Sequence, residues 1–212
     1  MDQITLEGED FARAAFNALA FTPARSPIPA AMLYVSRGEA YFLATDTYTI
    51  GRPSLGLVGQ GLGDRAIELT RADLAALDKL GRACKGEVRV EMPNDNGLVV
   101  SAVQAPMQEV IPDRGSSLNY DRSVWDLCHS LLEKLDRQDA ALPEVLALDP
   151  SLLSRFGKIK TERGLSPMLD LRIVSEKDPI LIKCGPGFLG ALMPVDREVA
   201  AVAPTRGGDF LW

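Results

Sequence analysis

A repeated strand–cap–helix pattern constrains the fold of this chain more than any other feature of its sequence. Residues 67–80 and 146–159 carry the same kinds of residue at a constant offset. Thr70 and Asp149 are favoured helix N-caps, and Pro150 suits the first position of a helix. Such a repeat indicates two related halves. The matched pairs are Ile67 and Leu146, Leu69 and Leu148, Thr70 and Asp149, Leu74 and Leu153, Leu77 and Phe156, Lys79 and Lys158, and Leu80 and Ile159.

The two halves differ in what separates their helices. The first half reads as strand, helix, hairpin, strand, helix, hairpin, with helices over about 11–19 and 70–80 and a hairpin at 32–44. The second half places a helix over 125–135 only about ten residues before the next, so its middle strands are missing. We therefore predict an α+β fold with domains at 1–112 and 113–195 and a tail at 196–212.

The composition and motifs favour a cytoplasmic binding protein over an enzyme. No apolar run approaches the roughly 20 residues of a membrane span, and the N-terminus lacks signal-peptide character. Cys84, Cys128 and Cys184 form no C-x-x-C motif, so we expect no metal or other cofactor. His129 is the only histidine and no nucleophile motif accompanies it. Within the glycine-rich stretch 51–63, the run 56–63 precedes a predicted strand, which favours a hairpin loop over a dinucleotide site.

Positive charge is concentrated on the two repeated helices although the chain carries a net charge of −6. The stretch 70–85 has a net charge of +2, and the stretch 150–163 has a net charge of +3. Solvated helix faces would explain this, and so would helices that face a phosphate backbone. The charge alone leaves both interpretations open.

Three short motifs in order resemble the DNA sliding clamp family, in particular the bacterial DNA polymerase III beta subunit. The first is the strand–turn–strand segment 28–49, which contains Ala44-Thr45-Asp46. The second is Val110-Ile111-Pro112, and the third combines 179–183 with Leu192-Met193-Pro194-Val195. The resemblance implies two clamp-like domains from a phage or bacterium, with paired helices on one face, antiparallel sheets on the other and an abbreviated second domain.

The resemblance also implies two binding surfaces. Double-stranded DNA would contact the helices through Arg13, Arg71, Lys79, Arg82, Lys85, Lys134, Arg155, Lys158 and Lys160. A peptide from a DNA polymerase or clamp loader would enter an apolar pocket formed by Ile28, Thr45, Thr47, Tyr48, Thr49, Ile50, Pro106, Val110, Met193, Pro194 and Val195. The chain departs from the family at Thr47, where the family has glycine, and at Thr49 and Glu109, where it has arginine.

The function implied is that of a processivity factor that encircles or lies along duplex DNA and tethers a polymerase. The alternative is a clamp-derived adaptor that binds a replication protein without encircling DNA. A six-domain ring built from two-domain chains would be a homotrimer. The apolar end Asp209-Phe210-Leu211-Trp212 either packs on the nearest sheet or occupies the Ile28/Tyr48/Met193 groove as a competing peptide.

Overall fold

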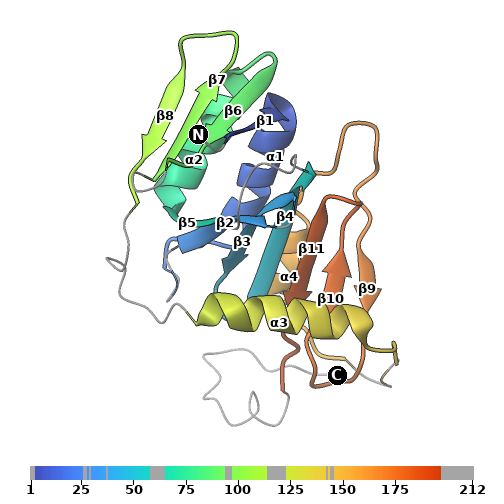
Figure 1. Ribbon diagram of the computed structural model, residues 1–212. Coiled ribbons are helices and arrows are strands. Elements are labelled where there is room, and N and C mark those ends of the chain that lie inside the picture. The colour runs from blue at the N-terminus through green and yellow to red at the C-terminus, as the bar shows by residue number, and fades with distance from the viewer. Residues whose placement is uncertain are drawn as a thin grey trace.

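Two antiparallel sheets and four helices form the described part of the chain in a computed structural model (Figure 1). The structure describes residues 3–25, 28, 30–36, 38–57, 65–93, 97–113, 123–141, 143 and 146–196. Residues 118–120, which precede the helix expected over 125–135, and the tail after residue 196 lie outside these residues. Among the described residues no helix is both long and apolar enough to cross a membrane.

The smaller sheet has one buried and one polar face. Its strands are β1 (Gln3–Glu7), β6 (Glu87–Glu91), β7 (Leu98–Ala102) and β8 (Gln108–Ile111), in the order β1-β6-β7-β8. Alternate residues enter the core, as an antiparallel sheet with one solvated face requires. The buried set is Ile4, Val88, Val90, Leu98, Val100 and Ile111.

The larger sheet joins strands from both halves of the chain. It contains β2 (Ala30–Ser36), β3 (Glu39–Thr45), β4 (Thr49–Leu57), β5 (Arg65–Thr70), β9 (Asp170–Arg172), β10 (Ile180–Lys183) and β11 (Phe188–Leu192). Their order is β5-β2-β3-β4-β11-β10-β9. β4 pairs with β11 over five residues, so the predicted division at residue 112 separates segments that share one sheet.

The glycine-rich stretch 51–63 begins as a strand, because β4 continues to Leu57. Of the hairpin loop predicted over 56–63, residues 56 and 57 therefore belong to β4, and the others lie outside the described residues. Gly51 lies in this strand where a Cβ atom would come within 2.3 Å of the Phe21 ring. A glycine inside a strand often marks such a close approach, and here it lets an aromatic ring pack directly on the backbone. The glycine-rich composition of this stretch does not show that Gly51 belongs to a strand and lies against the Phe21 ring.

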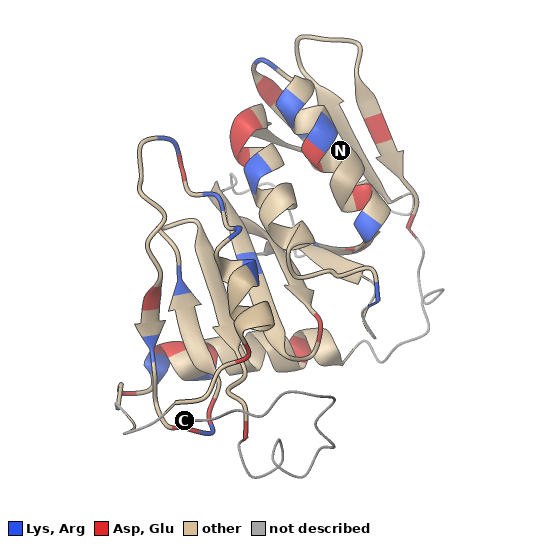
Figure 2. Ribbon diagram, turned by 180° about the vertical axis from the view of Figure 1, so that it is seen from behind, with Lys and Arg blue, Asp and Glu red and all other residues tan. Residues whose placement is uncertain are grey.

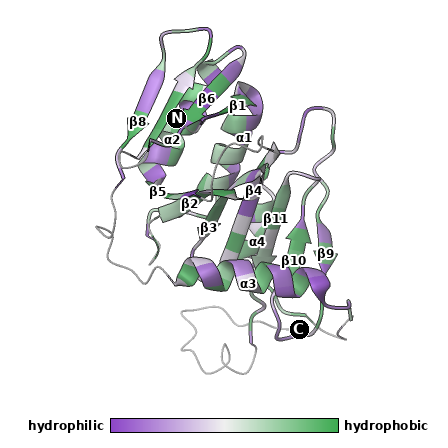
Figure 3. Ribbon diagram, viewed as in Figure 1, coloured by the Kyte–Doolittle hydropathy of each residue, from purple (hydrophilic) through white to green (hydrophobic). Residues whose placement is uncertain are grey.

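Three helices cover one side of both sheets. They are α1 (Gly8–Leu19), α2 (Arg71–Ala83) and α4 (Pro150–Phe156). A Cβ atom on Gly81 would come within 2.9 Å of the Ala12 Cβ, so glycine permits the close packing of α1 and α2. The predicted caps are confirmed: Thr70 forms a capping box with Asp73, and Asp149 accepts from the backbone N–H groups of Ser151 and Leu152. Figure 3 shows the apolar strands between these helices and α3.

The fourth helix, α3 (Val124–Arg137), lies on the opposite face of the larger sheet (Figure 1). The expectation that the helices of the second half would pair on one face is therefore wrong. Strand β3 is buried from Ala40 to Thr45 on both of its faces, so it requires cover on both sides. Helix α3 supplies this cover with Trp125, Cys128, Leu132 and Leu135, which pack on Ile28, Ala30, Met32, Leu43, Ile50, Leu181 and Ala191.

We predict that Trp125→Ala loosens α3 from the sheet and lowers the free energy of unfolding by about 3–5 kcal/mol, because a buried aromatic side chain is lost. Trp125 is 2% exposed. Burial raises the pKa of the neighbouring Cys128 thiol to about 11, so this thiol should react with alkylating agents only when α3 lifts. Urea denaturation and the rate of Cys128 alkylation measure the two effects.

Leu127→Ala is the matched control, because Leu127 lies on the same helix and is 66% exposed. It should leave both the stability and the alkylation rate of Cys128 unchanged. Rapid Cys128 alkylation in the unaltered protein would contradict a firmly packed α3.

Candidate nucleic-acid interface

A hollow between α1, α2 and the segment after α4 gathers basic side chains around an aromatic ring. It has a volume of about 440 Å³, and its lining includes Arg13, Arg82, Lys160 and Arg163. The Lys160 Nζ lies 4.0 Å from the centroid of the Phe16 ring, and the Arg82 Cζ lies 5.2 Å from it. Such cation–π contacts hold both charges over the ring and leave their hydrogen-bond donors available.

Asn17 fixes the segment after α4 against α1. Its Nδ2 donates to the Lys160 carbonyl at 2.9 Å, and its Oδ1 accepts from the Lys160 backbone N–H at 2.9 Å. Asn17 is 3% exposed, so this pair of bonds is protected from water. The sequence analysis did not single out Asn17 or Phe16, whose positions within a helical pattern indicate only that they belong to α1.

Carboxylates within the hollow partly neutralise its basic groups. Arg13 Nη1 lies 2.5 Å from Asp10 Oδ1, and Arg82 Nε lies 2.7 Å from Asp78 Oδ1. The residues that line the hollow are four cations and the two carboxylates of Glu9 and Asp78, a net charge of +2 in a chain of −6. Asp10 and Glu162, which pair with Arg13, lie beside this lining and are not in the count. Figure 2 shows these basic and acidic residues together on the helical side. Each pair has one half-exposed member, Asp10 at 50% and Arg82 at 51%, and one largely buried member, Arg13 and Asp78 at 15% each. The Arg82 guanidinium is therefore the one of these two cations that a phosphate can reach.

Three more of the predicted DNA-binding residues are exposed on α2 or shortly after α2 and α4. Lys79 is on α2, Lys85 follows that helix, and Lys158 follows α4. Lys79 and Lys85 are each three residues from Arg82 in the sequence, and Lys158 is two residues before Lys160, so all three are close in the chain to residues that line the hollow.

Arg71 and Lys134 do not line the basic hollow. The Arg71 guanidinium donates to the carbonyl oxygens of Leu19 at 2.9 Å and Thr22 at 2.5 Å, so it closes the C-terminal end of α1. Arg71 is nevertheless an exposed residue of α2, and its contact with DNA stays a prediction. Lys134 lies on α3, on the opposite face of the larger sheet, so grouping it with the other cations on one surface was wrong. Charge patterns do not show on which face a helix packs.

Arg155 was also assigned to the DNA surface, and the structure places it in an ion pair with Asp46. Its Nη1 contacts the Asp46 carboxylate and lies 2.9 Å from Thr49 Oγ1. Asp46 also accepts from the Thr49 N–H at 2.9 Å and the Thr49 hydroxyl at 2.7 Å. The two side chains are 7% (Asp46) and 18% (Arg155) exposed. Asp46 therefore orders the β3–β4 turn, as expected of a turn former, and also connects this turn to α4.

We predict that Arg155→Met lowers the free energy of unfolding by about 3 kcal/mol, since removing one member of a buried pair leaves the other charge unpaired. Arg137→Met is the control, because Arg137 is 80% exposed and pairs only at the surface with Glu133. Urea denaturation compares them, and equal stability of the two variants would show that the Asp46–Arg155 pair contributes little.

The predicted peptide pocket is not an open groove. Ile28 and Ile50 are buried beneath α3. Thr45 and Thr49 are each 1% exposed, and the Thr45 hydroxyl donates to the Thr49 carbonyl at 2.8 Å. The apolar residues that the resemblance assigned to the peptide pocket are therefore present, but helix α3 of the same chain covers Ile28 and Ile50. An amphipathic helix at 125–135 was expected, but its sequence did not show on which face of the sheet it packs.

The remaining pocket residues fall into two separate groups. Thr47, Tyr48 and Met193 are exposed where the central strands β4 and β11 begin and end, and the Met193 N–H donates to the Tyr48 carbonyl at 2.9 Å. Pro194 and Val195 follow Met193. Pro106 and Val110 belong to the turn and strand that end the smaller sheet. Beside Tyr48 is a hollow of about 360 Å³ that the sequence did not predict, lined by Pro23, Arg25, Asp46, Tyr48, Asp149, Leu152 and Arg155.

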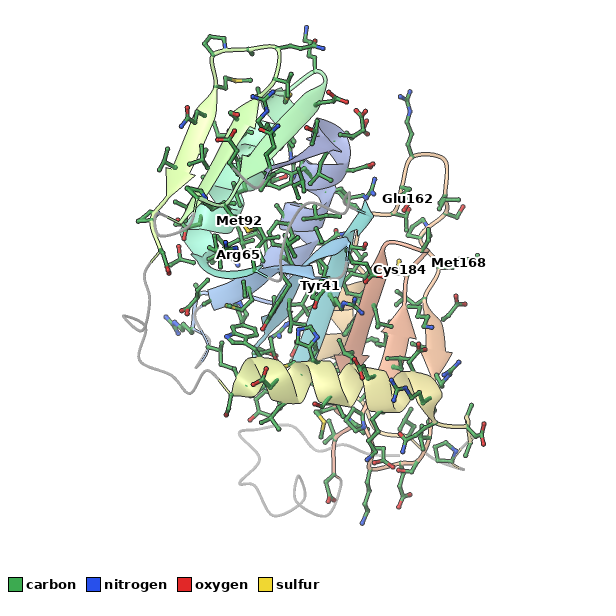
Figure 4. The ribbon with its side chains drawn as sticks, viewed as in Figure 1. Tyr41, Arg65, Met92, Glu162, Met168 and Cys184 are labelled. Atoms are coloured by element: carbon green, nitrogen blue, oxygen red, sulfur yellow. The ribbon has the colours of Figure 1, made fainter. Side chains whose placement is uncertain are left out.

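His129 joins an aromatic cluster on the face that α3 covers. Its ring lies 4.7 Å from Tyr34 and 5.5 Å from Tyr41, and its Nε2 is 3.3 Å from the Tyr41 hydroxyl (Figure 4). Burial, reinforced by the nearby Arg52 charge, lowers the pKa of His129. The imidazole is therefore held in place by packing. Among the described residues no group of three metal-ligating side chains occurs.

Thr47 is the only described residue other than glycine with a positive φ, at 81°. This is the position at which the sliding clamps have glycine. A β-branched residue in this region is strained by about 1–2 kcal/mol. We predict that Thr47→Gly raises the free energy of unfolding by about 1 kcal/mol, measured by urea denaturation. Thr47→Ala keeps a Cβ atom and should gain less, so an equal or larger gain for alanine would contradict backbone strain.

The comparisons with known proteins agree with this architecture. No family model and no curated protein matches the chain. Among solved structures, a putative DNA polymerase III beta subunit from Eubacterium rectale matches with a TM-score of 0.68 and 11% identity, over 93% of this chain and 66% of that one. The fold of this chain is that of a DNA sliding clamp. The resemblance predicted from the sequence is therefore confirmed at the level of the fold.

Two further sliding-clamp structures show the same relation. A clamp from Pseudomonas aeruginosa bound to griselimycin gives a TM-score of 0.64 at 12% identity, over 92% of this chain and 65% of that one. The DNA polymerase III beta subunit from Thermotoga maritima gives 0.59 at 13% identity, over 95% and 67%. The chain thus spans about two thirds of the length of the clamps that it matches.

Proposed function

We propose that this chain is a non-enzymatic, sliding-clamp-like processivity factor that lies along duplex DNA with its helical side toward the phosphates. The observation that carries the proposal is the basic hollow around Phe16 in a chain whose net charge is −6. Its location on the face formed by α1, α2 and the segment after α4 matches the face that the clamp resemblance assigns to DNA. We place this action in the cytoplasm, with the replication proteins.

The chemistry of the hollow suits binding that does not depend on base sequence. Lysine and arginine at a phosphate backbone release counterions and read no bases. Arg82 and Lys160 are held over Phe16, so their charges are positioned before DNA arrives. The pairs Arg13–Asp10 and Arg82–Asp78 weaken the attraction and would keep the contact mobile, as sliding requires.

We further propose that a polymerase or clamp-loader peptide docks at the exposed Tyr48 and Met193, at the ends of β4 and β11, and in the adjoining hollow rather than beneath α3. Tyr48 is 60% exposed and Met193 37%, and Pro23 and Leu152 line the hollow beside Tyr48. An aromatic or aliphatic anchor fits such a surface, and Arg25 offers a cation to an acidic residue of the peptide.

The paired charges also favour a second candidate, an adaptor that binds a replication protein and does not contact DNA. Arg71 and Arg155 serve the fold, and Arg13 and Arg82 have carboxylate neighbours. In that case the helical side would be an ordinary solvated surface. DNA binding and its dependence on salt separate the two candidates.

We predict that the double variant Arg82→Gln, Lys160→Gln binds a linear duplex more weakly, to a similar extent for all base sequences. The slope of log affinity against log salt should decrease by about 1.8, at about 0.9 for each phosphate contact. Fluorescence anisotropy at several salt concentrations measures this slope.

The control is Lys134→Gln with Arg137→Gln, which removes the same charge from α3. It should keep the slope of the unaltered protein. If both double variants lower the slope equally, DNA binding depends on the net charge of the chain and not on the basic hollow. If the unaltered protein does not bind the duplex at low salt, the adaptor candidate replaces the DNA-binding one.

A further inference from the structure

Helix α3 brings an imidazole ring to the larger sheet at the flank of its apolar contact. His129 lies 4.7 Å from the Tyr34 ring and 5.5 Å from the Tyr41 ring, and it is nearly perpendicular to both, at 82° and 77°. Tyr34 and Tyr41 are paired directly across β2 and β3, and their rings stack at 5.4 Å. The only histidine of the chain therefore belongs to the contact that holds α3 on the sheet.

Both faces of the Tyr41 ring are already covered. The Arg52 Cζ of β4 lies 4.2 Å from the ring centroid. Because β3 lies between β2 and β4, Tyr34 and Arg52 contact Tyr41 from opposite sides. A cation is stabilised over the face of an aromatic ring, and Arg52 occupies that position. A proton on His129 would therefore add a second positive charge near Arg52, with no face of Tyr41 left to stabilise it.

Burial has the largest effect on the charge state of His129. It lowers the pKa of the imidazole, and the Arg52 charge lowers it further. Two carboxylates of α3 itself, Asp126 and Glu133, act in the opposite direction and do not reverse the shift. The contact between α3 and the sheet therefore favours the neutral imidazole. Two further charged pairs lie on these elements, Glu39 of β3 with Arg52 at 3.2 Å and Asp136 of α3 with Lys183 of β10 at 2.7 Å.

We propose that α3 is a proton-sensitive cover of the larger sheet, which is released when His129 takes up a proton. The apolar face that α3 covers includes the buried side chains of Met32, Leu43 and Ile50. Release would expose this face without breaking the pairing of β4 with β11. The inference goes beyond the proposed function, because it rests on the contacts of α3 and does not involve DNA.

The direction of the pH effect follows from the two states of α3. In the released state His129 is solvated and titrates near its ordinary pKa of about 6.5, whereas in the closed state its pKa is lower. Between these two pKa values the released state binds more protons, so acid favours release by up to about tenfold for each pH unit. Above both values the imidazole is neutral in both states, and release no longer depends on pH through His129.

Hydrogen exchange of the full chain, corrected for the intrinsic exchange rate at each pH, tests the proposal. Protection of the α3 amides should fall about fivefold or more between about pH 7.5 and about pH 5.5. Helix α2 (Arg71–Ala83) is the internal reference, and its protection should change much less. Since the chain has one histidine, its imidazole resonance in an NMR titration should give a pKa below the ordinary value.

Two variants assign the effect to this cluster. His129→Gln removes the titrating group, so the protection of α3 should be the same at both pH values. Arg52→Met removes the nearby positive charge and raises the pKa of His129 in the closed state. The fall in protection should then be smaller and should end at a higher pH than in the unaltered protein.

Any of four results would overturn the proposal. One is protection of α3 that does not change between the two pH values, and another is an imidazole pKa at or above its ordinary value. A fall in protection that persists in His129→Gln would assign the effect to a different group. An equal fall in α2 and α3 would show that acid unfolds the whole chain and does not release α3 alone.

Discussion

The pairing of β4 with β11 is the contact on which the rest of the structure depends. It joins the two halves of the chain into one sheet, and the Asp46–Arg155 pair reinforces it from the β3–β4 turn. The junction brings α4 and the following segment beside α1, where Asn17 binds the backbone of Lys160. Lys160 and Arg82 then meet over Phe16, so the basic hollow exists only because the two halves are joined in this way.

Strands buried on both faces explain why this clamp fold carries a helix on the outer face of a sheet. The strand face with Met32, Leu43 and Ile50 would be a large exposed apolar surface without α3. The same cover closes the groove that the resemblance to clamps suggested for a partner peptide. The abbreviated second half therefore keeps the sheet junction, and the surface left for a partner lies at Tyr48 and Met193.

The sequence predicted the features that depend on local pattern. The caps at Thr70 and Asp149 and the strand around 41–44 follow from residue types and their spacing. The clamp-like fold was implied by the resemblance of three short motifs to the sliding clamps. The face chosen by α3 and the pairing of Arg155 with Asp46 depend on contacts between distant segments, which spacing does not reveal. The site was predicted in part, because an exposed cation and a cation that binds a carbonyl, such as Arg71, look alike in a sequence.

The most direct test of a DNA-facing helical side is lysine acetylation of the full chain with and without duplex DNA, followed by mass spectrometry. The account predicts that DNA protects Lys79, Lys158 and Lys160, while Lys134 on α3 reacts at the same rate in both samples. Protection of Lys134 equal to that of Lys160, or no protection of Lys79, Lys158 and Lys160 under conditions in which DNA is bound, would contradict it.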